Sequence, residues 1–339
     1  MAQQTQNVVL VTLDGLRWET LYRGLDQQIL KDKQSTSSPE NLVEKFGGDR
    51  VESRAKIFPW VWSKAVQQGQ LYGNRDRNAF CSVTNPYAIS YPGYSEMITG
   101  YGDPRVDSNA KVDNPNVSVF EVVNKTKKFK NKVAVFGSWE RYPEIFNSKR
   151  SHIFVNAGFT KFESDNFTDQ QLFSMQDKLT GPCGCCRQDA LTFALAKSYI
   201  KQHQPRLLQV SFNLTDEYAH AGSYNRYIEM AHNSDLMIGQ LWDFMQNIKQ
   251  YKGKTTFIIT TDHGRGMSPK SSWRDHGVSA LPDAANTWMI VLGPDTKTTG
   301  EMIDTEIHTN QIAATIAQLL KVDYQPPFEI GAPISSAIQ

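Results

Sequence analysis

The sequence lacks any apolar run that reaches the roughly 18 residues needed to span a membrane, and it lacks an excess of either charge. Its 36 basic and 35 acidic residues give a net charge of +1 at pH 7. A general nucleic-acid surface requires a basic excess, so this balance argues against one. The short basic run at residues 125–132 is therefore interpreted as a solvated helix end.

Cysteine is scarce, with one residue at Cys81 and three in the segment GPCGCCRQD, namely Cys183, Cys185 and Cys186. A structural zinc site usually draws on two well-separated pairs of ligands, and this spacing does not match that pattern. Two interpretations stay open. An exported protein could form one disulfide, for example between Cys81 and the cluster; alternatively, all four are buried inert thiols.

The first residues, MAQQTQ, are polar and too short to form a signal peptide. A cytoplasmic protein and an exported protein without its signal both fit this start. Because Ala-Gln-Gln resembles the stub that signal cleavage leaves, we expect a periplasmic or secreted protein, with a cytoplasmic location left open. The sequence does not indicate the oligomeric state.

Apolar, β-rich segments alternate with segments of helical periodicity along most of the chain. Strands are predicted at residues 8–15, 132–139, 207–214, 255–262 and 287–293, and helices at 117–126, 187–202, 225–248 and 310–322. Continuous apolar strands are typical of a parallel sheet buried on both faces. The prediction is a single α/β domain over residues 1–339, a doubly wound, mostly parallel sheet with helices on both faces and insertions near 20–60 and 140–185. Thr309 is the predicted N-cap of the last helix.

Carboxylates follow three of the predicted strands, at Asp14, Asp216 and Asp262. In a doubly wound sheet, ligands bind at the carboxyl ends of the strands. One such aspartate is explained by helix capping, but three would leave several charges unpaired near the core. They therefore indicate a binding site.

Histidines accompany these carboxylates at short spacings. Asp216 and His220 are four residues apart, so both can face one point. Asp262 and His263 are adjacent at a sharp turn, and His276 precedes the last predicted strand. Oxygen and imidazole ligands without thiolate suit zinc, or alternatively manganese.

The segment AISYPGYSEMITG, residues 88–100, comes close to a sulfatase signature. In that signature a Cys or Ser, converted to formylglycine, is followed by x-Pro-x-Arg. Here Ser90 and Pro92 match, and Tyr94 occupies the arginine position. Taken alone, the segment leaves three alternatives for Ser90: a modified residue, a plain nucleophile or a turn serine.

Together the motifs resemble the alkaline phosphatase superfamily, and within it the nucleotide pyrophosphatase/phosphodiesterase branch. The segments that carry the resemblance are LVTLDGLRWE, SYPGYSEMITG, DEYAH, ITTDHGRG and the DHG that precedes TWMIVLGP, and they span almost the whole chain. The resemblance implies two divalent metal ions, Zn²⁺ or else Mn²⁺. Carried over, the first metal site comprises Asp14, Ser90, Asp262 and His263, and the second comprises Asp216, His220 and His276.

The resemblance also favours a plain nucleophile at Ser90, because formylglycine formation needs the arginine that Tyr94 replaces. Pro92 and the Thr-Gly pair at 99–100 are in register with the family. The chain departs from the branch in three ways. It has Ser for the usual Thr, Gly93-Tyr94 for the usual Asn-His, and no long insertion before the last histidine. These departures bear on the substrate class more than on the chemistry.

The last metal ligand has three candidates. His232 lies within an amphipathic segment, which is typical of a surface or core histidine, and His308 precedes a predicted helix start. His276 lies on the loop entering a buried strand, where the resembling family places its last ligand. His276 is therefore the predicted ligand.

The implied activity is hydrolysis of a small-molecule phosphoric ester through a covalent phosphoserine. The phosphoryl oxygens then need donors, for which the amide of Ser90 or Tyr91 and a side-chain amide are candidates. Asn109 is the first choice for that side chain and Asn114 the second, with a simple turn asparagine as the alternative.

Two further functions stay open. A phosphomonoesterase or sulfatase-like hydrolase would add cationic side chains for the extra charge. The cations near the motifs are Arg17, Arg105, Lys111, Arg265 and Arg274. A non-catalytic, metal-stabilised binding protein would have the same ligands, but Ser90 would be dispensable.

Overall fold

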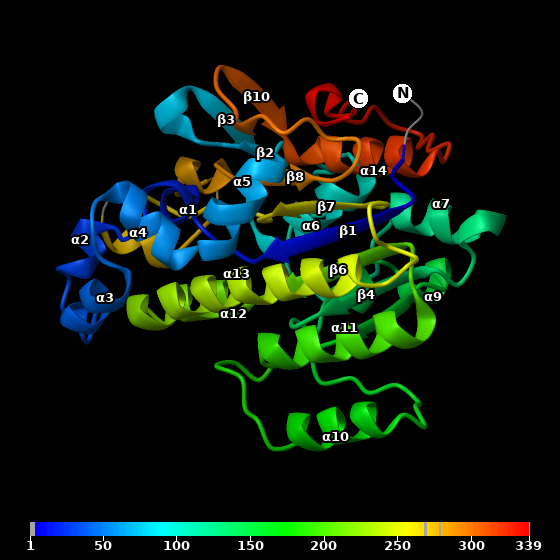
Figure 1. Cartoon of the computed structure of the whole chain (residues 1–339), viewed down its shortest axis with the longest axis horizontal. Coiled ribbons are helices and arrows are strands. Elements are labelled where there is room, and N and C mark those ends of the chain that lie inside the picture. Colours follow the sequence, from blue (N-terminus) through cyan, green and yellow to red (C-terminus); the bar gives the residue numbers. More distant parts are fainter. Residues whose placement is uncertain (1–3, 268–269, 278, 339) are drawn as a thin grey trace.

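The computed structural model describes residues 4–267, 270–277 and 279–338, and its centre is an eight-stranded sheet (Figure 1). The strand order is β5-β4-β6-β1-β7-β8-β2-β9. These strands are β1 (Asn7–Leu13), β2 (Gly69–Tyr72), β4 (Val133–Gly137), β5 (Phe154–Ala157), β6 (Leu207–Phe212), β7 (Thr255–Thr260), β8 (Met289–Leu292) and β9 (Gly300–Glu301). A separate pair joins β3 (Ala79–Ser82) to β10 (Thr305–His308) in parallel.

The sheet is mostly parallel, and its middle is formed by β6, β1 and β7. Val11 of β1 pairs with Val210 on one side and Ile259 on the other. All seven residues of β1 are buried, as expected for a strand covered on both faces. Only β8 departs in direction, since it runs antiparallel to both β7 and β2. The predicted fold class is confirmed.

Helices cover both faces of the sheet, and Figure 1 shows α11 and α13 on one side and α14 on the other. Val9 and Val11 pack with α11 (Asp189–His203) and α13 (Tyr224–Gln246). Val8 and Leu10 point the opposite way, towards α6 (Ser90–Thr99), α7 (Val119–Lys125) and α14 (Ile312–Leu320). This alternation is the two-residue period of a strand.

Shorter helices fill the connections. They are α1 (Trp18–Arg23), α2 (Gln27–Leu30), α3 (Pro39–Phe46), α4 (Arg50–Ile57), α5 (Val66–Gln68), α8 (Tyr142–Ile145), α9 (Ser148–Ser151), α10 (Phe167–Gln176) and α12 (Leu214–His220). Most of them lie in the two segments expected to be insertions. The second of these segments also contains β5, which pairs with β4 at the edge of the main sheet.

The five predicted strands and four predicted helices are all present, with one correction at the last helix. Thr309 is not its N-cap. Thr309 begins a short 3₁₀ turn capped by His308, and α14 starts at Ile312. The Thr309 hydroxyl instead donates to the buried carboxylate of Glu96 at 2.6 Å, so a tertiary contact replaces the expected local one.

The cysteines also require a correction. Cys183 is bonded to Cys185, whereas Cys81 and Cys186 are free and buried. Cys81 lies on β3, where its sulfur accepts a hydrogen bond from Thr287 Oγ1 at 3.2 Å. The proposed bridge between Cys81 and the cluster is therefore wrong, and only Cys81 resembles a simple buried thiol.

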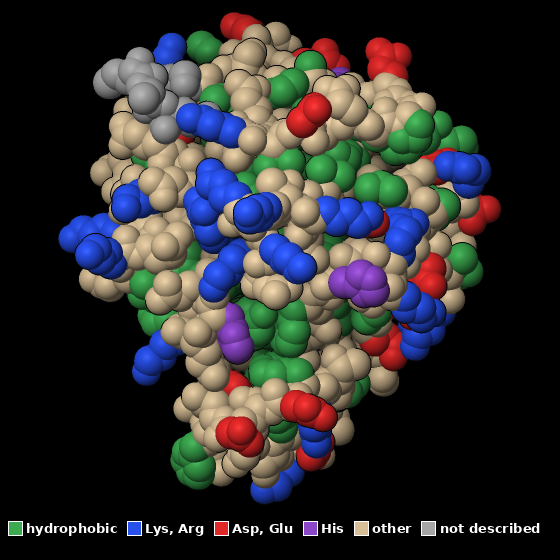
Figure 2. Space-filling view, turned by 90° about the vertical axis from the view of Figure 1, so that its right-hand side faces the viewer, with side chains coloured by type: hydrophobic (Ala, Val, Ile, Leu, Met, Phe, Trp, Pro, Cys, Tyr) green, Lys and Arg blue, Asp and Glu red, His purple; other side chains and the backbone are tan. Residues whose placement is uncertain are grey.

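The edge of the sheet where the strands begin carries a concentration of Lys and Arg side chains (Figure 2). Residues 125–132 lead from the end of α7 to the start of β4, and their lysines are exposed or half-buried, which fits a solvated helix end. Burial, and then the like charges of Arg206 and Lys321, lower the pKa of Lys128. Within the described ranges, none of the helices combines the length and apolar character that a membrane crossing needs.

Candidate active site

The three carboxylates that follow strands meet at the edge of the sheet where the strands end. This edge lies opposite the one that carries the concentration of Lys and Arg side chains. Asp14 follows β1, Asp262 follows β7, and Asp216 lies in α12 directly after β6. Because β6, β1 and β7 are neighbours and parallel, their carboxyl ends open at one place. Asp14 and Asp262 are 1% and 0% exposed, so their charges need compensation.

In the first predicted metal group, the other three side chains surround the imidazole of His263. His263 Nε2 lies 3.3 Å from Ser90 Oγ and 3.5 Å from Asp14 Oδ1. The same nitrogen lies 3.4 Å from Asp262 Oδ2. Ser90 Oγ is itself 3.5 Å from Asp14 Oδ1. The structure thus brings together all four residues of this group.

The second predicted group is equally compact. His220 Nε2 lies 3.4 Å from Asp216 Oδ2 and 3.1 Å from His276 Nε2. His276 Nε2 lies 3.9 Å from Asp216 Oδ1. His308 lies elsewhere, with its Nδ1 2.9 Å from Ser82 Oγ.

The two groups form one continuous site. The rings of His263 and His276 stack with their centroids 3.9 Å apart. Donor atoms of Asp14, Asp216 and His263 lie within 4.8 Å of one another. Seven side chains from distant parts of the chain therefore face a common space.

The spacing of the donor atoms fits bound cations. Nitrogen and oxygen ligands at 2.0–2.1 Å from a tetrahedral ion lie about 3.3 Å from each other, and most of the distances above are close to that value. Most of these distances are also longer than those of ordinary hydrogen bonds. Asp262 Oδ2 is buried and has no hydrogen-bond partner in the part of the chain that the structure describes. A divalent ion would satisfy this oxygen.

Backbone carbonyls orient two of the imidazoles. His263 Nδ1 lies 2.8 Å from the carbonyl oxygen of Gly264, and His276 Nδ1 lies 3.2 Å from that of Ala88. In each ring Nδ1–H is the donor, so Nε2 keeps its lone pair. This is the usual arrangement behind a metal-ligating histidine.

The electrostatics of the protein alone favour neutral groups. Burial, and then the neighbouring Asp262, raise the pKa of Asp14 well above its usual range, and burial raises the pKa of Asp262 to about 7. Burial also lowers the pKa of His263, and it lowers that of His276 strongly. A bound divalent cation would favour carboxylate anions and neutral imidazoles, which are the ligating forms.

Arg265 forms an ion pair with Asp216 of the second group. Its guanidinium pairs with Asp216 Oδ1 and also donates to the carbonyl oxygens of Gly15 at 3.0 Å and Arg274 at 2.7 Å. Burial lowers the pKa of Arg265 to about 9. From the sequence, Arg265 is a candidate cation for binding a charged substrate. These contacts instead make Arg265 a positioning residue for Asp216.

Tyr94 is a residue whose contact the sequence did not reveal. Its hydroxyl donates to Asp14 Oδ2 at 3.0 Å. It lies four residues after Ser90 on α6, so both side chains face Asp14. Gly93 permits this packing, because a Cβ there would collide with the backbone carbonyl of Asp262. The spacing of Ser90 and Tyr94 was the only signal available beforehand.

The predicted substrate-binding pair lies beside Ser90. Asn109 Oδ1 accepts a hydrogen bond from the Tyr91 amide at 2.8 Å, so the two groups are adjacent. That amide is engaged by Asn109 in this arrangement. The second candidate, Asn114, is buried and its amide donates to Ser95 Oγ at 3.0 Å, so it is not free to bind substrate.

The contact between Tyr94 and Asp14 leads to a prediction. Tyr94→Phe keeps the ring and removes the donor, which should weaken metal binding by about 10–100-fold, the range typical of such supporting hydrogen bonds. Competition against a chelator would measure the change. Tyr91→Phe is the matched control, because the Tyr91 hydroxyl donates to the carbonyl of Val112 at 2.6 Å. Equal weakening in both variants would contradict the assigned role.

A mostly parallel sheet with these residues at its carboxyl edge is the arrangement expected for the alkaline phosphatase superfamily of ester hydrolases. A family model described as Sulfatase matches residues 131–322, which is more than half of the chain, and the chain therefore belongs to the sulfatase family. The match begins after Ser90, so it does not bear on the nucleophile. No curated protein sequence matches the chain.

Solved structures share the fold at low sequence identity. The alkaline phosphatase PafA is 12% identical with a TM-score of 0.56, and the match covers 98% of this chain and 99% of PafA. The lipoteichoic acid synthase LtaP from Listeria monocytogenes is 12% identical with a TM-score of 0.61, covering 99% of this chain and 77% of LtaP. Murine ectonucleotide pyrophosphatase/phosphodiesterase 5 is 12% identical with a TM-score of 0.54, covering 96% and 97%.

Proposed function

We propose that this chain hydrolyses phosphoric diesters, in the manner of nucleotide pyrophosphatases and phosphodiesterases, through a phosphoserine formed on Ser90. Two divalent ions, Zn²⁺ or else Mn²⁺, would be held by the two groups described above. The observation that carries the proposal is the position of the Ser90 hydroxyl. It lies within 3.5 Å of both Asp14 and His263 at the carboxyl edge of the sheet.

Ser90 is also placed well to carry a phosphoryl group. It is the first residue of the ten-residue helix α6, and a helix N-terminus carries partial positive charge that favours a phosphate. Ser90 Oγ attacks phosphorus and the leaving group departs as an alcohol. Water then releases the phosphate monoester and restores the serine. Bound divalent ions would lower the pKa of the serine hydroxyl and offset charge on the phosphoryl oxygens.

Tyr94 argues against the formylglycine chemistry of sulfatases. The signature needs Arg at this position, whereas Tyr94 is fully buried and hydrogen-bonded to Asp14. Since that position serves a carboxylate of the first group, Ser90 acts in this proposal as the unmodified residue.

Three of the five cations near the motifs are already paired with carboxylates, which supports a diester over a monoester. Of the other two, Lys111 lies 3.9 Å from Glu140 and Arg274 donates to Ser35 Oγ at 3.0 Å. Arg17 is buried and pairs with Asp26 at 3.2 Å. Arg105 pairs with Asp103 at 2.6 Å, and Arg265 is occupied by its ion pair with the second group. A monoester carries an extra negative charge, and these three side chains are already neutralised.

The test is a parallel assay of zinc-loaded protein on a nitrophenyl phosphodiester, a phosphomonoester and a sulfate ester. We expect the diester to be hydrolysed fastest. A chelator should abolish turnover and added Zn²⁺ should restore it, because the proposed chemistry depends on the bound ions. Preference for the sulfate ester, or full activity in protein that metal analysis shows to be free of divalent ions, would refute the proposal.

A further inference from the structure

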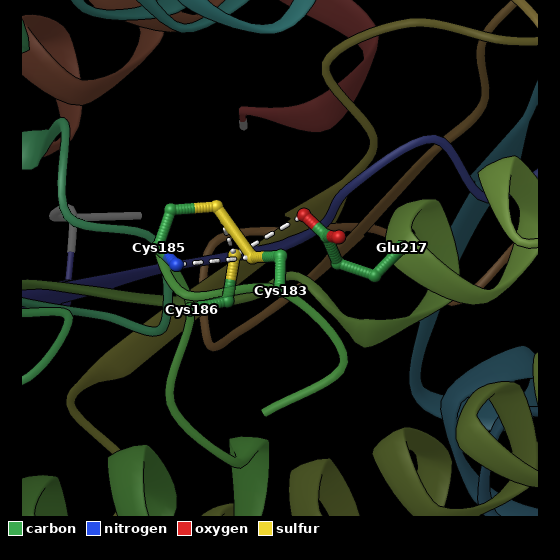
Figure 3. A group of neighbouring side chains, drawn as sticks. All are labelled: Cys183, Cys185, Cys186 and Glu217. Carbon is green, nitrogen blue, oxygen red and sulfur yellow. Dashed lines mark hydrogen bonds between the residues drawn. A yellow bond between two sulfur atoms is a disulfide. The ribbon is translucent and has the colours of Figure 1, made fainter. Parts of the chain in front are cut away.

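Three cysteines and a glutamate converge outside the candidate active site (Figure 3). Cys183 is bonded to Cys185, and Cys186 Sγ lies 3.5 Å from Cys185 Sγ. Glu217 projects from α12, with its Oε1 3.2 Å from Cys186 Sγ. Ligand atoms of all four residues lie within 4.8 Å of one another. We refer to Cys183, Cys185, Cys186 and Glu217 as the thiol cluster.

A disulfide alone does not account for this arrangement. A bridge between residues only two apart closes a very short loop, which restricts the unfolded chain little and so stabilises little. The bridge also leaves Cys186 unused. That buried thiol is nevertheless directed at a carboxylate, and Asn213 Nδ2 lies 3.2 Å from its sulfur. Three sulfur atoms and one carboxylate together provide four potential metal ligands, whereas the disulfide joins only two of the sulfurs.

The backbone holds the cluster in place independently of the disulfide. Hydrogen bonds and an antiparallel bridge join residues 185–187 to residues 138–140, which follow β4. At the start of the loop, a Cβ on Gly181 would collide with the carbonyl oxygen of Cys186. These contacts do not involve sulfur, so reduction of the bridge would leave Cys185 and Cys186 in place, with Cys183 between them and the closely packed Gly181.

The cluster is also accessible to a small ion. Cys186 is 0% exposed, whereas Cys183, Cys185 and Glu217 are half-buried. A Cβ on Gly184 would meet no atom within 4 Å, so the loop between the two bonded cysteines is open. An ion can reach the sulfurs from solvent while one ligand stays enclosed.

We propose that the reduced thiol cluster binds one thiophilic divalent ion of the zinc class. Three thiolate sulfurs and one oxygen of Glu217 make the four ligands that such an ion takes in a closed site. A dithiol supplies two electrons and two protons, becomes a disulfide itself, and converts the Cys183–Cys185 bridge into two thiols. The ion then displaces one proton from each of the three thiols on binding.

The fourth ligand explains why the cysteine spacing did not indicate a metal site. Glu217 is distant in sequence and is delivered by α12. The same helix carries Asp216 and His220, so an ion in the thiol cluster would anchor α12 beside the candidate active site. The proposal does not depend on the proposed function, because its donor atoms are separate from those seven residues.

Cadmium is a suitable probe, since Cd²⁺ bound by thiolates gives a charge-transfer absorption that nitrogen and oxygen ligands do not give. The whole chain is reduced, freed of reductant without air and titrated with Cd²⁺. We expect the absorption to saturate at about one thiolate-bound ion per chain, as one tetrahedral donor set predicts. The oxidised protein should show no such band until it is reduced. Absence of the band in the reduced protein would overturn the proposal.

Variants identify the ligands. Cys186→Ser should weaken both the band and the binding, because one of three thiolates is lost, and Glu217→Gln should weaken binding at least about 10-fold, since even supporting groups typically contribute that much. Cys81→Ser is the matched control, as Cys81 is the one cysteine outside the cluster, and it should bind normally. His276→Ala should also keep the band, which separates this test from that of the active site. An undiminished band with unchanged affinity in Cys186→Ser, or a lost band in Cys81→Ser, would contradict the assignment.

Discussion

Ser90→Ala is expected to abolish ester hydrolysis, with kcat falling by at least about 10⁴-fold, as removal of a covalent nucleophile typically does. The variant loses the only hydroxyl that lies within 3.5 Å of both Asp14 and His263 among the described side chains. Steady-state turnover of the diester measures the loss. Intact mass of the wild-type chain should correspond to an unmodified serine.

Two nearby serines provide controls for this result. Ser82 Oγ contacts His308 Nδ1 at 2.9 Å, and Ser95 Oγ accepts from Asn114 Nδ2 at 3.0 Å. Their alanine variants should keep turnover, since neither hydroxyl faces the metal groups. Full activity in Ser90→Ala would refute the assignment of the nucleophile. A wild-type protein that binds metal and hydrolyses none of the three esters would instead support the non-catalytic binding protein.

His276→Ala is expected to reduce the bound metal from two ions to about one per chain, with loss of most activity. The second group would then retain only Asp216 and His220. Losing one of three protein ligands should exceed the 10–100-fold loss typical of a supporting group. Metal analysis after gel filtration gives the stoichiometry, measured on protein with the Cys183–Cys185 bridge intact so that the thiol cluster does not contribute.

His308→Ala is the control for the second metal group. The His308 ring contacts Ser82 and lies 3.7 Å from Glu306 Oε1, so both ions should remain. Loss of metal in His308→Ala with retention in His276→Ala would place the last ligand at the end of β10 rather than on the loop before β8.

The clustering of the seven predicted ligands could be foreseen because each of them follows a strongly apolar strand or lies in a compact motif. Asp14 and Asp262 end fully buried strands, and a sheet rule then places them together. The contact of Tyr94 with Asp14 could not be predicted in this way, because it joins α6 to β1 across the tertiary structure. The same holds for Arg265, whose partners come from two distant segments.

The helix that begins at Ser90 also could not be predicted from the sequence. Its first residues, Ser-Tyr-Pro-Gly, are typical of a turn, yet a proline in the first helical turn needs no amide hydrogen bond. The strands β2, β3 and β5 have four residues each, too few to show a period. The pairing of the one disulfide could not be predicted, because a count of cysteines does not reveal which of them are close in space.

The order of the strands ties ion binding to the stability of the whole chain. Asp14, Asp216 and Asp262 extend from β1, β6 and β7, which are the three adjacent strands in the middle of the sheet. In an unfolded chain these carboxylates are far apart, so ions bind the native state selectively. At a free concentration 1,000 times its Kd, each ion held there would add about 4 kcal/mol to the free energy of unfolding. Removing the ions with a chelator would therefore lower the temperature at which the whole sheet unfolds.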